Sequence, residues 1–316
     1  MIEQENTPIF STESHGKIML TGEYGAMYGA NVLAIPLKVG QTLNVYEKEY
    51  GSLEWEAYKL DGLWHKVAFA DKLDGKLHIG DRTNAGFAVV IHKVIRMALN
   101  ISNGKLEDIL NKKFITNINF NPELGLGSSS TLIVNVARYF NIDPFELNSL
   151  SFKGSGYDIA ASKSDLPVIY NKNVKNPQYV ELKFKPPFHS NLYFVYSGKK
   201  VSSLKAIDKI SRKNFTNQQL SQISSITTNM ALCNNIDDFI EIMNEHEKII
   251  SKILHIPTLN SKQFYDFEGS IKSLGAWGGD MMLVATKHPD QYVENYFNRR
   301  GLDVIYKYSD LALDID

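Results

Sequence analysis

A short run of glycine and serine constrains this chain more than any other feature of its sequence. Residues 122–131 read PELGLGSSST, with two glycines two positions apart and three serines directly after them. The alternation of Phe114–Phe120 predicts a strand before this run, and the apolar spacing of Thr131–Phe140 predicts a helix after it. A strand that turns at glycine and then enters a helix is a common setting for a bound phosphate.

The residue types of this loop suit an anionic ligand. Gly125 and Gly127 let the backbone turn tightly and approach a ligand closely. The first amides of a helix can donate to phosphate oxygens, and serine hydroxyls can do the same or bind magnesium. The alternative is that Ser128–Thr131 only cap the helix, although one such residue would be enough. The chain has neither a P-loop nor the glycine pattern of a dinucleotide-binding domain.

The overall charge excludes a general attraction to nucleic acid or to an anionic membrane. The 316 residues carry 34 Lys and Arg against 35 Asp and Glu. The one cysteine, Cys233, cannot form an internal disulfide, and we expect it buried in a helical stretch over 227–240. No segment approaches the ~20 apolar residues of a membrane span, and the N-terminus does not resemble a leader. We therefore expect a cytoplasmic protein with a small-molecule partner, with no nucleic acid or membrane partner, as a monomer or homodimer.

Strands and helices alternate along the chain, which indicates an α/β or α+β protein. Residues 53–69 predict a hairpin that turns at Asp61-Gly62, and residues 84–99 predict a helix. Later segments predict a strand at 192–196, two helices within 217–254 and a strand at 281–286. The polar, proline-containing stretch 171–187 marks a boundary, and we expect domains 1–180 and 181–316.

Three segments resemble, in order, the three motifs of the GHMP kinases, the superfamily of galactokinase, homoserine kinase, mevalonate kinase and phosphomevalonate kinase. They are GKIMLTGEYGAMYGANVLAIPL from Gly16, the loop at 122–130, and KSLGAWGGD at 272–280. Between the second and third stands GSGYDIA at 154–160, which resembles a bacterial subgroup named for Gly-Tyr-Asp-Ile-Ala. The resemblance spans most of the chain.

The resemblance implies an α+β, two-domain GHMP kinase fold. The N-terminal ATP-binding domain would be similar to domain 2 of ribosomal protein S5, and the C-terminal domain would be ferredoxin-like. It also implies a magnesium- and ATP-dependent kinase that transfers the γ-phosphoryl group to an alcohol or phosphate acceptor, with mevalonate, in isoprenoid precursor synthesis, as the first candidate.

Other activities stay open at this point. Phosphomevalonate is an alternative acceptor, because Lys199, Lys200 and Lys205 could bind its additional phosphate. A diphosphomevalonate decarboxylase fits the motifs less well. A non-catalytic nucleotide-binding protein on the same fold is a further alternative, motivated by Trp277 and Leu274, which depart from the third motif.

The resemblance implies roles for particular residues. Asp158 would act as general base on the acceptor hydroxyl, with Lys17 beside it to lower its pKa and stabilise developing charge. Magnesium would be bound by Ser129 and Glu23. The phosphates of ATP would be held by Gly125, Leu126, Gly127, Ser128, Ser129 and Ser130. The substrate would be bound by Lys199, Ser202, Gly275, Ala276 and Gly278.

Two further groups allow both a structural and a functional interpretation. Trp55, Tyr58 and Trp64 are expected in the hairpin core rather than in an adenine pocket. His246 lies on a stretch that resembles the helix lining the substrate pocket of mevalonate kinases, and a surface position is equally consistent with its sequence context.

Overall fold

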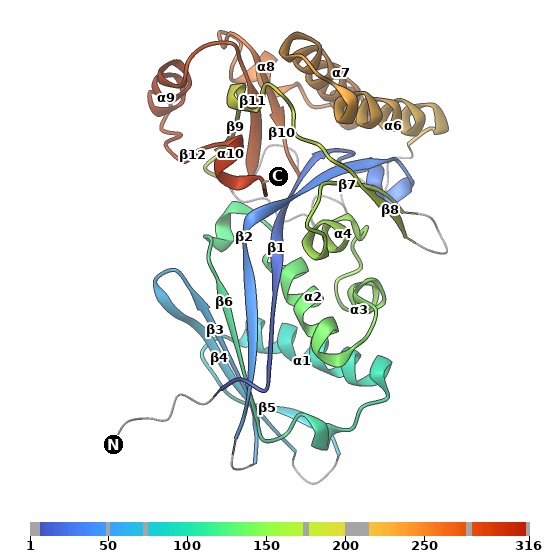
Figure 1. Cartoon of the computed structure of the whole chain (residues 1–316), viewed down its shortest axis with the longest axis vertical. Helices are drawn as coiled ribbons and strands as arrows, with labels where there is room; N and C mark the ends of the chain where they lie inside the picture. The colour runs from blue at the N-terminus through green and yellow to red at the C-terminus, as the bar shows by residue number, and fades with distance from the viewer. Residues whose placement is uncertain are drawn as a thin grey trace. The chain divides into compact units, whose positions relative to one another are not determined.

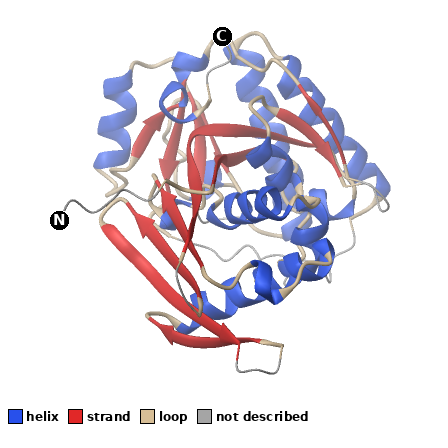
Figure 2. Cartoon of the chain, turned by 60° about the horizontal axis from the view of Figure 1, so that its bottom comes forward, coloured by secondary structure: helices blue, strands red, loops and turns tan. Residues whose placement is uncertain are grey.

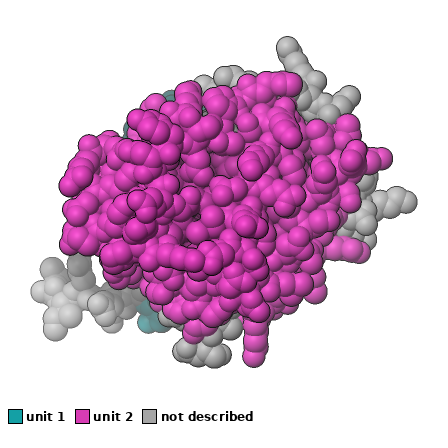
Figure 3. Space-filling model, turned by 90° about the horizontal axis from the view of Figure 1, so that it is seen from above, with its two compact units in different colours: residues 1–16, 39–122, 127–163 teal, residues 17–38, 123–126, 164–316 magenta. Residues whose placement is uncertain are grey.

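The computed structural model of the protein describes residues 7–48, 51–71, 75–172, 177–199, 215–275 and 280–313. The chain forms two compact units, which Figure 3 colours separately. Unit 1 contains residues 1–16, 39–122 and 127–163, and unit 2 contains residues 17–38, 123–126 and 164–316. Because the chain enters each unit more than once, these units do not coincide with domains 1–180 and 181–316, and that division stays a prediction.

A mixed sheet forms one layer of unit 1. Its strands are ordered β5-β4-β3-β6-β2, and β1 pairs with β2. β3 runs parallel to β6, whereas β2–β6, β3–β4 and β4–β5 are antiparallel. The strands are β1 Phe10–Thr21, β2 Val32–Glu47, β3 Leu53–Lys59, β4 Gly62–Asp71, β5 Leu77–Arg82 and β6 Lys112–Ile118 (Figure 1).

The predicted hairpin is confirmed by β3 and β4, which pair in antiparallel register up to Lys59 and Gly62. Trp55 is fully buried and stacks on Phe114 with 5.0 Å between ring centroids, so it belongs to the core as expected. Trp64 instead stacks on the neighbouring His65 ring, with 4.6 Å between centroids. Successive side chains of a strand point to opposite faces of the sheet, which is why inward-facing and outward-facing residues alternate along this segment of the sequence.

Helices cover one face of this sheet (Figures 1 and 2). Asn84 caps α1, because its side-chain oxygen accepts from the Phe87 amide at 2.9 Å. Asp143 caps α3 in the same way, with Pro144 at the first helical position. The core between helices and sheet contains Trp55, Phe114, Val94 and Ile133, among others. The helices are α1 Ala85–Ser102, α2 Ser128–Phe140, α3 Pro144–Ser151 and α4 Tyr157–Lys163.

The expectation that no segment could span a membrane needs one qualification. By length and composition alone, the 18 residues of α1 are apolar enough to cross a bilayer. One face of α1, including Ile91, Val94 and Ile95, is buried in the core of unit 1. A core helix of this kind passes the same criterion, so the helix is weak evidence for a membrane.

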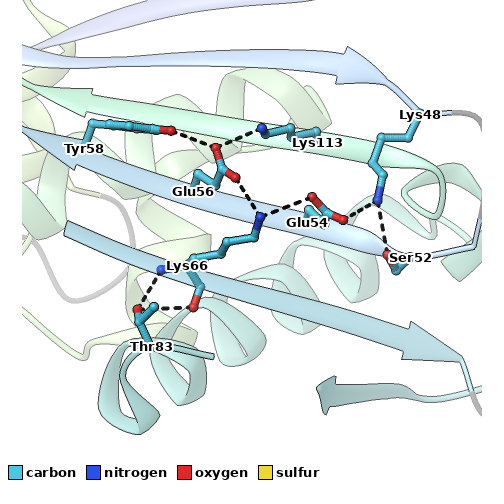
Figure 4. Close-up of polar contacts among 8 residues, drawn as sticks. All are labelled: Lys48, Ser52, Glu54, Glu56, Tyr58, Lys66, Thr83 and Lys113. Atoms are coloured by element: carbon cyan, nitrogen blue, oxygen red, sulfur yellow. Dashed lines mark hydrogen bonds and ion pairs between the residues drawn. The ribbon is translucent and has the colours of Figure 1, made fainter. Parts of the chain in front are cut away.

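The outward side chains of β3 form a charged network with neighbouring strands (Figure 4). The Glu56 carboxylate accepts hydrogen bonds from Lys66, Lys113 and Tyr58, each at 2.9 Å, and its side chain is only 7% exposed. Burial alone would raise the pKa of Glu56, but these three donors outweigh it and lower the pKa from 4.5 to about 2.

We expect Glu56→Gln to lower the free energy of unfolding at pH 7 by about 1–2 kcal/mol, since it removes a paired and largely buried charge. Because the folded pKa is depressed, this stability is present above about pH 4.5 and is lost as the pH falls toward about 2. Urea unfolding at pH 7 and pH 3 measures the effect. Glu47→Gln is the control, because the Glu47 side chain is 60% exposed in its pair with Lys112. A loss that is equal at both pH values would contradict this role of Glu56.

A second, antiparallel sheet lies in unit 2, in the order β10-β11-β9-β12. Its core contains Val195, Ile271, Met282, Val284 and Phe297, among others. The strands predicted at 192–196 and 281–286 are confirmed by β9 and β11. The strands are β9 Leu192–Tyr196, β10 Ser270–Ser273, β11 Met281–Ala285 and β12 Ile305–Lys307.

The two helices predicted within 217–254 are confirmed as α6 and α7. Thr216 caps α6 through a reciprocal pair with Gln219, in which each side chain bonds the other residue's backbone amide. Asn235 caps α7 by accepting from the Asp238 amide at 2.9 Å. Among the described residues of unit 2, the helices are α6 Asn217–Leu232, α7 Ile236–Leu254, α8 Leu259–Lys262, α9 Asp290–Asn298 and α10 Tyr308–Leu311.

Unit 2 also contains the short strands β7 and β8. β7 pairs antiparallel with Val32–Ala34 of β2, and β8 pairs with β7. Their bounds are β7 Val168–Asn171 and β8 Gln178–Glu181. In the part of the chain that the structure describes, 3-10 helices lie at η1 Gly25–Tyr28, η2 Leu106–Asp108, η3 Pro122–Leu124 and η4 His189–Asn191.

The position expected for Cys233 is wrong. The helical pattern is interrupted, because α6 ends at Leu232 and α7 begins at Ile236. Cys233 is the C-cap residue of α6 and is half-buried. The following asparagines explain the break, since Asn235 provides the cap of the next helix.

Candidate functional site

The second half of the glycine-serine loop, from Gly127 onward, forms the N-terminus of α2 in unit 1. The helix begins at Ser128, three residues earlier than the sequence predicts, and Gly127 is its N-cap in the left-handed conformation with φ 104°. No side chain of the described residues caps this end of the helix. The serines are therefore the first residues of the helix and do not cap it, so the first-turn amides stay available to an external acceptor.

The three serines of the loop have different surroundings. Ser130 is buried; its hydroxyl donates to the Gly127 carbonyl and accepts from Ser162, both at 2.9 Å. Ser129 is exposed and Ser128 is half-buried. A ligand at this helix terminus would thus meet backbone amides together with the hydroxyls of Ser128 and Ser129.

Asp158 lies in the first turn of α4, directly after the turn at Gly156. Gly156 has φ 98°, a conformation that favours glycine. The Asp158 carboxylate accepts from the Ile159 amide at 3.1 Å and is half-buried. The hydrogen bond between Ser162 and Ser130 fixes α4 to the first turn of α2. Unit 1 therefore holds Asp158 and the serines of the loop on two helices that are joined directly.

The first half of the loop, residues 123–126, belongs to unit 2. There the Lys17 ammonium donates to the Gly125 carbonyl at 3.1 Å, and the Lys17 amide donates to the Leu126 carbonyl at 2.8 Å. A Cβ on Gly125 would lie 2.9 Å from the carboxyl carbon of Asp280, and its φ is 70°. Glycine is required at this position for both reasons, and Lys17 and Asp280 hold the segment in place.

Glu23 is buried in unit 2 in an ion pair with Lys272. Their side chains are 2% and 0% exposed, and the Lys272 ammonium also donates to the Ser273 carbonyl at 3.0 Å. Burial alone would raise the pKa of Glu23, but Lys272 and His246 together hold it below its usual value. The carboxylate is thus charged and already neutralised by an ammonium, which does not favour the magnesium role implied by the resemblance.

His246 is the second neighbour of Glu23. Its Nε2 lies 3.1 Å from Glu23 Oε2 and 3.2 Å from the Gly22 amide nitrogen. Nε2 can accept from Gly22 when it carries no proton, or donate to Glu23 when it does. Burial and Lys272 lower the pKa of His246, which favours the neutral ring. The residue is 1% exposed, so the interpretation of His246 as a surface residue is wrong.

Glu247 adds a second buried carboxyl group to this cluster. Burial raises its pKa to about 8, and the charge of Glu23 adds to this effect while Lys272 opposes it. The backbone at Ser273 and Leu259 also opposes the rise, and the Glu247 side chain is buried. A neutral Glu247 at pH 7 leaves the pair of Glu23 and Lys272 electrically balanced.

Sequence reasoning missed Lys272 and Glu247, and it left His246 open. A signal was present for His246, because Phe239, Met243 and Ile250 place it on the apolar stripe of α7. Lys272 is the first residue of the third motif and lies in β10, and its pairing with the distant Glu23 gives no local sequence signal. In the part of the chain that the structure describes, no group of three or more metal-ligating side chains occurs.

The predicted substrate-binding residues are described only in part. Lys199 is exposed and Gly275 is half-buried. Ser202, Ala276 and Gly278 lie outside the described residues, as does Trp277. Leu274, the other departure from the third motif, is buried, and its amide donates to the Met281 carbonyl at 3.0 Å.

Comparison with solved structures identifies the fold. A mevalonate kinase from Methanococcus jannaschii superposes with a TM-score of 0.65 and 16% identity, over 96% of this chain and 98% of that one. A Streptococcus pneumoniae phosphomevalonate kinase, in complex with phosphomevalonate and AMPPNP, has a TM-score of 0.67 and 17% identity over 95% and 100% of the two chains. A Lactococcus lactis galactokinase in complex with galactose superposes with a TM-score of 0.64 and 14% identity, over 98% of this chain and 93% of that one.

These similarities extend over almost the whole of each chain. The protein therefore has the α+β fold of the GHMP kinases, which confirms the predicted resemblance and fold class at the level of structure. No protein-family model matches the sequence, and a search of curated proteins finds no relative.

The buried ion pair gives a test of its own. Either Glu23→Gln or Lys272→Met leaves an uncompensated charged group in the interior, and we expect each to lower the free energy of unfolding by about 3–5 kcal/mol. The double variant removes both charges, so its loss should be clearly smaller than the sum of the two.

Chemical denaturation of the four proteins in this double-mutant cycle measures the coupling. Lys287→Met is the control, because its pair with Asp237 is 60% and 66% exposed and should contribute less than about 1 kcal/mol. Additive losses in the cycle would show that the pair does not act as a unit.

Proposed function

We propose that this protein is an ATP-dependent phosphotransferase that transfers the γ-phosphoryl group to a small-molecule alcohol or phosphate acceptor. The observation that carries the proposal is the N-terminus of α2, where a glycine cap leaves the first-turn amides and the hydroxyls of Ser128 and Ser129 to an external ligand. The fold supports it, because the structures with which the chain superposes are small-molecule kinases.

ATP fits this helix terminus. Phosphate groups would be held by the amides of the first turn and by the backbone of 125–130, as the positive end of a helix dipole favours anions. The AMPPNP in one of the similar kinases is an ATP analogue and supports the choice of nucleotide. We assign magnesium to the exposed Ser129 hydroxyl, whereas for Glu23 we favour an anchoring role, since Lys272 already pairs with it.

Asp158 is the proposed general base. The acceptor oxygen attacks the γ-phosphorus, its proton passes to the Asp158 carboxylate, and the bond between the γ-phosphorus and the bridging oxygen breaks to release ADP. Lys17 is assigned to stabilising negative charge that develops during transfer. Phosphoryl transfer depends mainly on positioning the reacting groups and on neutralising the charge of the phosphates. Asp158 in the first turn of α4 and Lys17, which donates to the Gly125 carbonyl, are held in ways that suit this requirement.

Mevalonate is the acceptor that we put first. It has a hydroxyl group to phosphorylate and a carboxylate that would suit Lys199, and both a mevalonate kinase and a phosphomevalonate kinase superpose on the chain. Phosphomevalonate is the second candidate, because its phosphate would also suit a cationic residue. A cytoplasmic location follows from this function as part of the proposal.

A non-catalytic nucleotide-binding protein is the competing function. The departures from the third motif at Leu274 and Trp277 motivate it, and a binder would hold ATP without turnover. The presence of Asp158 beside the loop-bearing helix favours the kinase, since a protein that only binds nucleotide needs no general base.

ADP release with Mg-ATP against mevalonate, phosphomevalonate, homoserine and galactose tests the proposal. We expect turnover of one acceptor, and we expect Asp158→Asn to lower kcat by about 10²–10⁴-fold while ATP binding is retained, as for loss of a general base. Asp165→Asn, at an exposed position after α4, is the matched control and should keep its activity. ATP binding without turnover of any acceptor would favour the binder.

A further inference from the structure

A cavity of about 290 Å³ lies in unit 2, next to the sheet of β9–β12. Its apolar side is formed by Leu259, Phe264, Met282 and Leu302, which belong to or pack against the core of this unit. Its polar side is formed by Ser197, Lys199, Gln263, Ser273 and Arg300.

The charges at this cavity are positive. Lys199 and Arg300 line it, and no acidic residue is among the described lining residues. Arg300 is fixed by Asp266, to which it donates at 2.7 and 2.9 Å, and by Tyr296, whose ring lies 3.7 Å from the guanidinium carbon. Since Asp266 compensates Arg300, the uncompensated cation at the cavity is Lys199, which has no acidic partner among the described residues.

The backbone around Lys199 is held in a defined geometry. The Ser197 amide donates to the Asp280 carbonyl at 2.8 Å, and the Asp280 amide donates to the Lys199 carbonyl at 2.7 Å. The Ser197 hydroxyl also donates to the Lys199 carbonyl at 3.1 Å. Asp280 is the residue packed against Gly125, so the rim of the cavity is connected through one residue to the first half of the loop.

We propose that this cavity binds a small amphipathic anion, with a carboxylate or phosphate at Lys199 and a short apolar body against Leu259, Phe264 and Met282. A lysine ammonium is a suitable donor for either anion. The size and the mixed lining are those of a small-molecule site, in which a few polar groups orient a largely apolar ligand. The ligand is either the acceptor of the proposed kinase or a separate effector that regulates it.

Binding is measured without ATP, so that the result does not depend on the proposed function. The probes are 3-methylvalerate, a branched six-carbon carboxylate, its neutral counterpart 3-methylpentan-1-ol, and inorganic phosphate. Isothermal titration and saturation-transfer NMR on the full chain should show that the carboxylate binds at least tenfold more tightly than the alcohol.

Two variants localise the site. Lys199→Met keeps the aliphatic stem without the charge and should weaken 3-methylvalerate binding about tenfold or more, the size of one charge-assisted contact. Gln263→Glu places a negative charge at an exposed lining position and should weaken it as well. Lys262→Met, which removes an exposed cation that does not line the cavity, should bind like the unmodified protein.

Equal binding of the carboxylate and the alcohol, or unchanged binding in Lys199→Met, would overturn the proposal. Once an acceptor is known, a competition experiment between that acceptor and 3-methylvalerate shows whether the cavity binds the substrate or a separate effector. Displacement of 3-methylvalerate by that acceptor assigns the cavity to the substrate, whereas simultaneous binding assigns it to an effector. If the protein binds 3-methylvalerate but transfers no phosphate to any acceptor, the binding site proposed here is supported and only the proposed kinase activity is contradicted.

Discussion

The unsatisfied amides at the start of α2 are the constraint around which unit 1 is organised. A helix leaves its first four N–H groups without internal partners, and most helices satisfy some of them with a side-chain cap. Here the cap is Gly127, and Ser130 is turned toward Gly127 and Ser162 instead of the helix amides. The same hydrogen bond that occupies Ser130 fixes α4, so the carboxylate of Asp158 is positioned by the packing that leaves the helix terminus available.

Unit 2 depends on a different interaction, the buried pair of Glu23 and Lys272. It joins the glycine turn after β1 to the strand β10, in which the third motif begins. Burial, and to a smaller extent the negative charge of Glu23, raises the pKa of the neighbouring Glu247 to about 8, so this carboxyl group is mostly protonated at neutral pH. A buried pair of this kind is weak evidence for stability by itself, but loss of one partner leaves a charge that water cannot reach. Such an arrangement is suited to fixing the geometry of two motifs within the unit.

The sequence was sufficient for the elements whose signal is local. The hairpin of β3 and β4, the helices α6 and α7 and the strands β9 and β11 follow from alternation, helical spacing and turn residues. The order of three motifs also predicted the fold correctly.

The features that sequence reasoning missed depend on contacts between distant segments. The pairing of Glu23 with Lys272 joins residues 249 positions apart, so neither residue has a local signal for it. The apolar spacing predicts the start of α2 three residues too late because the serines contribute no apolar positions, and only the left-handed conformation of Gly127 identifies the cap. The pattern over 227–240 does not show the break between α6 and α7, and the expected position of Cys233 is wrong for this reason.

The direct test of the central claim is a ³¹P NMR spectrum of the chain with Mg-ATP and each candidate acceptor. We expect ADP and a new phosphorylated product to appear together in equal amounts with one acceptor. Formation of inorganic phosphate alone, or no consumption of ATP while ATP remains bound, would contradict phosphoryl transfer to a small molecule.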